Sequence, residues 1–189
     1  MKKKVIEHIK NFKGKVFVDI GAHIGKYSLI VAKRNPKAKI ISIEANPETF
    51  KILKKNIKLN NLKNIIPLNL AAYSKTTELH FYDIKFFSGL SSIYDITKGK
   101  KVKIMIKARK LDDILKKLKI KNVDMMKLDV EGSEPEVFKG ATKILKNKNL
   151  IIFFEAWNEY YLKKCEKILK KFGYDIKPVA EIMYMASRK

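Results

Sequence analysis

An acidic residue followed by regularly spaced glycines closes the first strongly apolar segment of the chain. Asp19, Gly21 and Gly25 match three positions of the pattern D-x-G-x-G-x-G, and His23 occupies the fourth. Glycines in such a turn admit positive φ and bring a ligand close to the backbone, while the N–H groups that open the following helix attract polar groups. Histidine is among the residues that tolerate the left-handed conformation. The segment is therefore a candidate cofactor-binding loop.

The same loop argues against a nicotinamide dinucleotide, whose fingerprint G-x-G-x-x-G requires glycine where His23 and Lys26 stand. A nucleoside is still favoured by Glu44, which ends the next apolar segment. A carboxylate there can accept hydrogen bonds from both hydroxyls of a ribose. Because the carboxyl ends of parallel strands meet at one edge of a sheet, we expect Glu44 and the loop to form one site.

Two more carboxylates, Asp129 and Glu131, stand at the carboxyl end of the strand predicted over residues 123–130, and Gly132 follows them. Strand alternation predicts that both lie on one face, and the cost of burying unpaired charges predicts that they face a polar ligand or a cleft. The competing interpretation is that Glu131 only bonds nearby backbone N–H groups or pairs with a lysine. The chain has one cysteine and three scattered histidines, so no zinc cluster and no metal is predicted.

Strand-like and helix-like segments alternate along the chain, which is typical of an α/β fold with a mainly parallel sheet. Strands are predicted over residues 15–20, 39–44, 65–70, 78–83, 102–107, 123–130, 150–155, 174–179 and 182–186, the last two as a hairpin. Helices are predicted over residues 1–14, 26–34, from 47 onward, 111–118, after Ser133, and 161–172. Ser133 and Glu136 have the spacing of a capping box. Cys165 falls on an apolar helical stripe, so we expect a core residue.

Length and composition predict one domain, residues 1–189, with residues 84–101 as a candidate substrate-facing insertion. A hydrophobic content of 46% excludes a disordered or collagen-like chain. No apolar run reaches the length of a signal or membrane-spanning segment, and with a single cysteine the expected location is the cytoplasm.

The charge of the chain is strongly positive and almost entirely due to lysine. Lys and Arg number 42 against 19 Asp and Glu, a formal charge of +23, and only three of the basic residues are arginines. Such a charge attracts nucleic acid. Sites that clamp phosphate or read bases favour the arginine fork, however, so a solvated lysine surface is the favoured interpretation.

The sequence resembles the FkbM family of S-adenosylmethionine-dependent methyltransferases. The resemblance extends over residues 16–155 and is carried by residues 18–28 (VDIGAHIGKYS), 42–47 (SIEANP), 69–74, 109–115 (RKLDDIL) and 126–140 (MKLDVEGSEPEVFKG). It implies a Rossmann-like methyltransferase fold, in which helices cover both faces of a mainly parallel seven-stranded sheet that ends in an antiparallel hairpin. It also implies S-adenosylmethionine as the cofactor. The chain departs from the family at His23, usually Asn, and at Lys26, often aromatic.

The resemblance also implies roles for individual residues. It places the cofactor against Asp19, Gly21, Ala22, His23, Gly25, Glu44, Ala45, Asn46, Ala72 and Asp129. Within that set, Glu44 would bind the ribose hydroxyls, Ala72 would lie near the adenine, and Asp129 would contact the amino-acid end or the acceptor. Asp129 and Glu131 are the candidate catalytic bases, Glu131 being favoured, and His23 is a weaker one. Two interpretations of Glu155 and Trp157 are equally favoured. These residues form the far wall of the site, or they only take part in ordinary loop packing.

The expected activity is O-methylation of a hydroxyl on a small molecule or a saccharide, with no membrane partner. One alternative is an RNA methyltransferase, favoured by the charge of +23. It is weakened because residues 129–132 (DVEG) replace the Asn- or Asp-Pro-Pro-aromatic tetrad common in RNA-base enzymes of this fold. The other alternative is a cofactor-binding module without catalysis, in which residues 84–101 contact a partner. The oligomeric state follows from none of these features.

Overall fold

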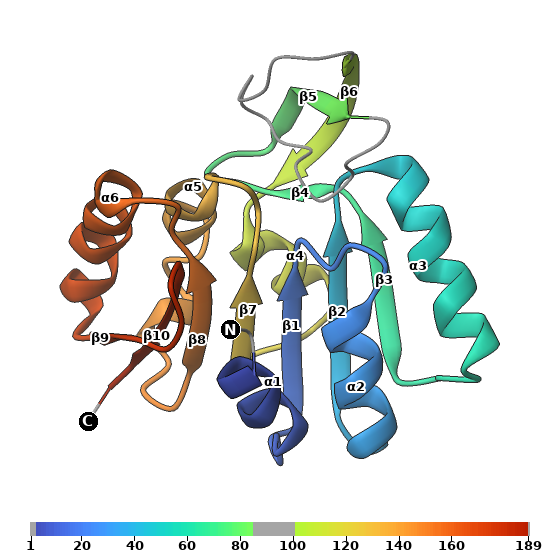
Figure 1. Ribbon diagram of the computed structural model, residues 1–189, viewed down its shortest axis with the longest axis horizontal. Helices are drawn as coiled ribbons and strands as arrows, with labels where there is room; N and C mark the ends of the chain where they lie inside the picture. Colours follow the sequence, from blue (N-terminus) through green and yellow to red (C-terminus); the bar gives the residue numbers. More distant parts are fainter. Residues whose placement is uncertain (1–2, 85–100, 189) are drawn as a thin grey trace.

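The main sheet has seven strands in the order β3-β2-β1-β7-β8-β10-β9 (Figure 1). The computed structural model describes residues 3–84 and 101–188. The strands of this sheet are β1 (Val16–Ile20), β2 (Lys39–Glu44), β3 (Ile65–Asn69), β7 (Met125–Leu128), β8 (Ile151–Glu155), β9 (Asp175–Pro178) and β10 (Met183–Ser187). The first five run parallel, and β10 is antiparallel to both β8 and β9. The predicted parallel sheet and C-terminal hairpin are confirmed.

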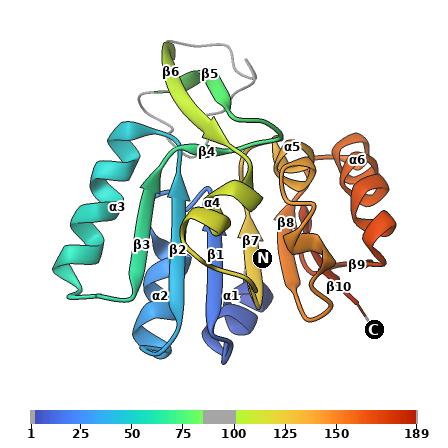
Figure 2. The same ribbon diagram turned by 180° about the vertical axis from the view of Figure 1, so that it is seen from behind.

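Helices cover both faces of this sheet, as Figures 1 and 2 show from opposite sides. One face packs against α1 (Lys3–Lys10), α2 (Lys26–Arg34) and α3 (Pro47–Leu59). The other packs against α4 (Leu111–Lys117), α5 (Glu134–Lys139) and α6 (Glu159–Leu169), with short 3-10 turns at Ile144–Lys146 and Lys170–Phe172. Because side chains alternate along a strand, Phe17 joins the first core, and Val18 and Ile20 join the second. The sheet is therefore buried on both sides, as parallel sheets usually are.

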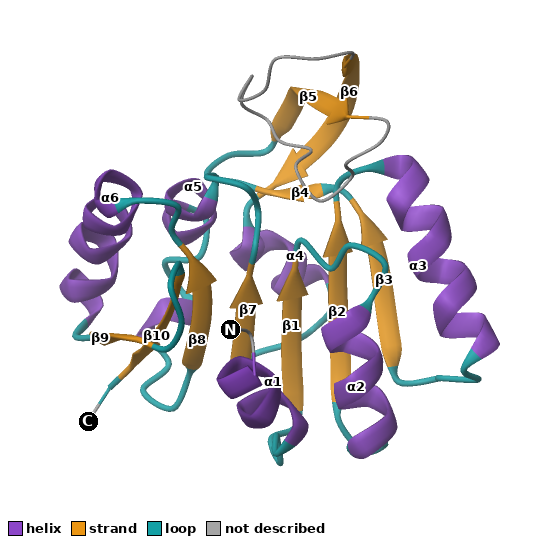
Figure 3. Ribbon diagram, viewed as in Figure 1, coloured by secondary structure: helices purple, strands orange, loops and turns teal. Residues whose placement is uncertain are grey.

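A second, smaller sheet lies beyond the carboxyl ends of the parallel strands (Figure 3). Its strands are β4 (Ala71–Ala72), β5 (Thr77–Ile84) and β6 (Lys101–Arg109), in the order β4-β6-β5. The two extended segments predicted here are confirmed, whereas their pairing into a separate sheet follows from no local pattern. The predicted insertion lies outside the described residues, apart from its two ends in β5 and β6. The small sheet thus stands over the edge where the candidate site was predicted.

Two smaller predictions can be checked as well. Cys165, in α6, is completely buried in the core on that helix's side of the sheet, as expected, and burial raises the pKa of its thiol. The capping box at α5 is wrong, since the Ser133 side chain makes no cap hydrogen bond and the Glu136 carboxylate pairs with Lys139.

Among the described helices, none combines the length and the apolar character that crossing a membrane requires.

Candidate active site

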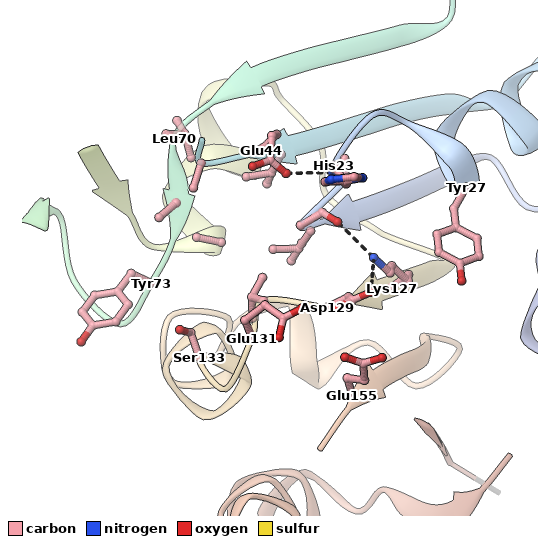
Figure 4. Close-up of a pocket in the computed structure, with 18 of the residues that line it drawn as sticks. His23, Tyr27, Glu44, Leu70, Tyr73, Lys127, Asp129, Glu131, Ser133 and Glu155 are labelled. Atoms are coloured by element: carbon pink, nitrogen blue, oxygen red, sulfur yellow. Dashed lines mark hydrogen bonds and ion pairs between the residues drawn. The ribbon is translucent and has the colours of Figure 1, made fainter. Parts of the chain in front are cut away.

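A cavity of about 550 Å³ lies at the carboxyl ends of β1, β2, β7 and β8, within the range typical of small-molecule sites (Figure 4). Most of the predicted site residues line it. They are Gly21, Ala22, His23, Glu44, Ala45, Ala72, Asp129 and Glu131. Asp19, Gly25 and Asn46 are buried and are not part of its lining. The topology therefore brings four distant sequence segments to one place.

The loop after β1 has the conformation that its glycines predicted. Gly21, His23 and Gly25 have φ values of 70°, 52° and 96°. The N–H groups of Gly21 and Ala22 both donate to the Ile43 carbonyl at 2.9 Å, which ties the loop to β2. A Cβ atom on Gly21 would lie 1.9 Å from the backbone oxygen of Asp129, so no other residue fits there without displacing the next turn. The loop is thus fixed from both neighbouring strands.

Glu44, at the end of β2, is held in place by two backbone donors. The N–H of His23 donates to its Oε2 at 2.8 Å, and the N–H of Asn46 donates to its Oε1 at 2.9 Å. Burial raises the pKa of the Glu44 carboxyl, while these two hydrogen bonds lower it. A carboxylate has about four acceptor sites, so two are left for a ligand. The Asn46 side chain caps the N-terminus of α3, so the residue whose N–H donates to Glu44 is itself held by the helix.

Lys127, in β7, was not predicted as a site residue, yet its ammonium contacts both the loop after β1 and the turn after β7. Its ammonium donates to the Gly21 carbonyl at 3.1 Å and lies 3.4 Å from Asp129 Oδ2 and 3.6 Å from Asp19 Oδ1. The side chain is only 2% exposed. Burial lowers its pKa, but the charges of Asp129 and Asp19 outweigh this and raise the pKa above its usual value. The signal in the sequence was a lysine within an otherwise apolar strand, MMKL.

Asp19 acts on the loop from the protein interior. It is fully buried, and its Oδ2 accepts hydrogen bonds from the Ser28 N–H at 3.1 Å and the Ser28 hydroxyl at 2.6 Å. Burial raises the pKa of Asp19, and Lys127 opposes this. Asp19 therefore links β1 to the first turn of α2. Its direct contact with a cofactor stays a prediction, as do the contacts assigned to Gly25 and Asn46.

The second pair of carboxylates lies in a turn and not in a strand as predicted. β7 ends at Leu128, and Glu131 has a φ of 53°, a conformation uncommon outside glycine. The turn nevertheless brings Asp129 and Glu131 together with Glu155, so that carboxylate oxygens of all three lie within 4.8 Å of one another. Oxygen donors of this kind suit a divalent cation. In this structure the positive charge of Lys127 lies beside Asp129.

Glu134, a buried residue, stabilises this turn by accepting a hydrogen bond from its backbone. The side chain is 1% exposed, and its Oε1 accepts a hydrogen bond from the Val130 N–H at 2.9 Å. Burial raises the pKa of the carboxyl to about 7, against the effect of the backbone hydrogen bond. The sequence alone assigned no role to Glu134, because a glutamate at the start of a helix is ordinary.

The two ends of the cavity differ in chemistry. Near Glu44 the lining is apolar and comes from Ile43, Leu70 and Ala72, which would suit a flat heterocycle. At the other end Glu155 and Trp157 form a wall, as one of the two interpretations of these residues predicted. An apolar slot beside a carboxylate with two unused acceptor sites fits a nucleoside.

Comparison with known proteins gives a family match over most of the chain. The family model "Methyltransferase FkbM domain" matches residues 19–176. The chain is 26% identical over 193 residues to "Methyltransferase sdnD" of Sordaria araneosa, a match that covers 84% of this chain and 73% of the relative. It is 28% identical over 137 residues to "Hexuronic acid methyltransferase AglP" of Haloferax volcanii, covering 72% of this chain and 54% of that protein.

A solved structure resembles the fold over nearly the whole chain. The methyltransferase FkbM from Methylobacillus flagellatus KT superimposes with a TM-score of 0.68 at 16% identity. The match covers 92% of this chain but 43% of that one. The chain therefore spans about half the length of AglP and less than half of this structural relative.

Proposed function

Because the chain belongs to the FkbM family of S-adenosylmethionine-dependent methyltransferases, we propose that it methylates a hydroxyl group of a small molecule or a saccharide. The observation that carries the proposal is the placement of Glu44. Its carboxylate is fixed by two backbone N–H groups, faces the cavity, and lies across it from the turn that holds Asp129 and Glu131. The residue proposed to bind the ribose and the candidate base thus line the same cavity (Figure 4).

We assign each part of the cofactor to residues that line the cavity. Glu44 has two acceptor sites left for the two ribose hydroxyls, and the apolar residues Leu70 and Ala72, which line the cavity, would flank the adenine. The loop at Gly21 and the carboxylate of Asp129, which both line the cavity, would hold the amino-acid end. When bound, S-adenosylmethionine supplies a methyl group on a positively charged sulfur. The chain has to align the acceptor with that group and take up the acceptor's proton.

Glu131 is the residue that we assign to proton removal. It lines the cavity at the apex of the turn after β7, in the uncommon backbone conformation with φ of 53°. Such a conformation costs of order 1 kcal/mol or more and often accompanies function. Asp129 is less suited to be the base, because the ammonium of Lys127 lies 3.4 Å from it and stabilises its ionised form. We assign Asp129 to binding and orientation.

The nature of the acceptor is supported by one of the relatives. AglP is named as a hexuronic acid methyltransferase, so a saccharide is the acceptor class to test first. RNA is a second candidate, and the observation in its favour is the formal charge of +23. Lysines spread over the surface would attract its phosphates without specifying a site.

A labelled-methyl assay against glycosides, small alcohols and total RNA tests this proposal. We expect transfer to an alcohol or glycoside, and we expect Glu131→Gln to slow it about 10²- to 10⁴-fold while S-adenosylmethionine still binds in calorimetry. Glu7→Gln removes a carboxylate from the exposed side of α1, outside the cavity lining, and is the matched control. Transfer confined to RNA would support the second candidate. Unchanged turnover in Glu131→Gln would remove this residue from the mechanism.

A further inference from the structure

The charge of the cavity is opposite to the charge of the molecule. The chain as a whole carries +23. Among the described residues that line the cavity, carboxylates outnumber lysines two to one. They are Glu44, Asp129, Glu131 and Glu155 against Lys26 and Lys127. An anionic ligand would therefore meet an attractive surface but a repulsive interior.

The negative charge is concentrated at the end of the cavity away from Glu44. Asp129, Glu131 and Glu155 place carboxylate oxygens within 4.8 Å of one another. The ammonium of the nearby Lys127 pairs with both Asp129 and Asp19 and donates a hydrogen bond to the Gly21 carbonyl. The Lys127 side chain is only 2% exposed. Because Glu155 is 5% exposed, water and salt screen its charge less than they would at the surface.

An aromatic wall stands beside these carboxylates. Trp157 lines the cavity and packs edge-on against Tyr161, with ring centroids 5.4 Å apart. Gly132 lets the turn that carries Glu131 approach this wall, since a Cβ there would lie 3.2 Å from Trp157 and 3.3 Å from Tyr161. An apolar ring face next to hydrogen-bond acceptors suits a molecule with one C–H face and hydroxyls along its rim.

A buried hydroxyl supplies an independent sign of a ligand. Ser133 lines the same cavity and is 5% exposed, and Figure 4 shows it beside Glu131. Its Oγ has no hydrogen-bond partner among the described residues. Buried polar atoms are rarely left unsatisfied, and each instance calls for a partner such as a water or a ligand. A hydroxyl can donate and accept, so it matches a ligand hydroxyl.

We propose that Glu131, Ser133, Glu155 and Trp157 form the acceptor subsite, and that it selects an uncharged polyhydroxylated ring over carboxylated sugars and phosphodiesters. The proposal rests on the function proposed above and narrows its acceptor class. It sets this chain apart from AglP, which is named for a hexuronic acid. Carboxylates form strong hydrogen bonds with donor hydroxyls and repel carboxylate and phosphate groups. Like charges placed together discriminate against the wrong partner even where the shapes are similar.

Matched pairs of glycosides test the selectivity. The 4-nitrophenyl β-glucoside and β-glucuronide differ only in a hydroxymethyl or a carboxylate at C6, and the β-galactoside and β-galacturonide form a second pair. Their affinities are measured by NMR titration of the protein saturated with S-adenosylhomocysteine, and a short single-stranded RNA is titrated alongside. We expect the uncharged member of at least one pair to bind at least tenfold more tightly than its uronide and than the RNA.

Two variants locate the effect. Glu155→Gln is expected to narrow the preference for the uncharged glycoside at least threefold, whereas Glu7→Gln leaves it unchanged. Trp157→Ala is expected to weaken glycoside binding with unchanged affinity for S-adenosylhomocysteine. Tighter binding of a uronide or the RNA, or no binding of either uncharged glycoside, would overturn the inference. Failure to bind S-adenosylhomocysteine would instead count against the proposed function itself.

Discussion

Replacing Lys127 with methionine should destabilise the protein strongly, although the two side chains have similar lengths. The change removes the ammonium 3.6 Å from Asp19 and 3.4 Å from Asp129, and Asp19 is fully buried. Removing one partner of a buried ion pair costs about 3–5 kcal/mol because the other charge stays buried and uncompensated. For a chain of this size, each kcal/mol lowers Tm by about 2–4 °C, so a decrease of about 6–20 °C is expected.

The loss should depend on pH in a defined direction. Burial raises the pKa of Asp19 and Lys127 lowers it, so the pKa rises further in Lys127→Met. A carboxyl whose pKa is higher in the folded than in the unfolded protein destabilises the fold once pH rises above the ordinary pKa of an aspartate, 3.8. The variant should therefore lose more stability at pH 8 than at pH 5. Adding Asp19→Asn should recover most of the loss at pH 8.

Urea unfolding, followed by the fluorescence of the single tryptophan, Trp157, measures these differences. Wild type, Lys127→Met and the Lys127→Met/Asp19→Asn double variant are compared at both pH values. Lys127→Arg is the control that keeps the charge. A loss below about 1 kcal/mol at pH 8, the range of an exposed pair, would refute the argument. A double variant no more stable than Lys127→Met at pH 8 would also refute it.

Further predictions concern single residues of the site. Glu44→Gln should weaken S-adenosylmethionine binding about 10- to 100-fold in calorimetry, since charged hydrogen bonds contribute about 1.5–3 kcal/mol; unchanged affinity would contradict its role. Gly21→Ala should abolish binding or lower Tm, because its Cβ would lie 1.9 Å from the Asp129 oxygen, and wild-type behaviour in both measurements would be incompatible with this turn. Glu131→Gln should reduce kcat about 10²- to 10⁴-fold with unchanged cofactor affinity, as single-turnover and calorimetric measurements can check. Because burial raises the pKa of Glu134 to about 7, the free energy of unfolding of the wild type should fall by on the order of 3 kcal/mol as pH rises from 4.5 to 7. Glu134→Gln should flatten this pH dependence in urea titrations. An equal dependence of the free energy of unfolding on pH in both proteins would show that Glu134 is not its source.

The elements of the main sheet could be predicted because each carries a strong local pattern. The helix over residues 26–34 and the strand over residues 39–44 have the predicted bounds, since glycine, proline or a change of periodicity marks their ends. The small sheet β4-β6-β5 could not be predicted in this way. Its pairing depends on contacts between distant segments, and no local propensity specifies which strands meet.

The candidate site was partly predictable for a related reason. Glu44 and the glycine loop end neighbouring parallel strands, so topology alone brings them together. Lys127 was missed because a lysine within an apolar strand is normally read as a surface residue, and its partner Asp19 lies 108 positions earlier in the chain. The strand predicted over residues 123–130 ends at Leu128 instead, and Asp129 and Glu131 follow it in a turn whose Val130 N–H donates to Glu134.

A crystal structure of the protein with bound S-adenosylhomocysteine tests the central claim most directly. We expect the ribose hydroxyls within hydrogen-bonding distance of the Glu44 carboxylate, the adenine against Leu70 and Ala72, and the sulfur facing the turn that carries Glu131. A nucleoside bound elsewhere on the molecule, or bound in this cavity with its ribose away from Glu44, would contradict the account.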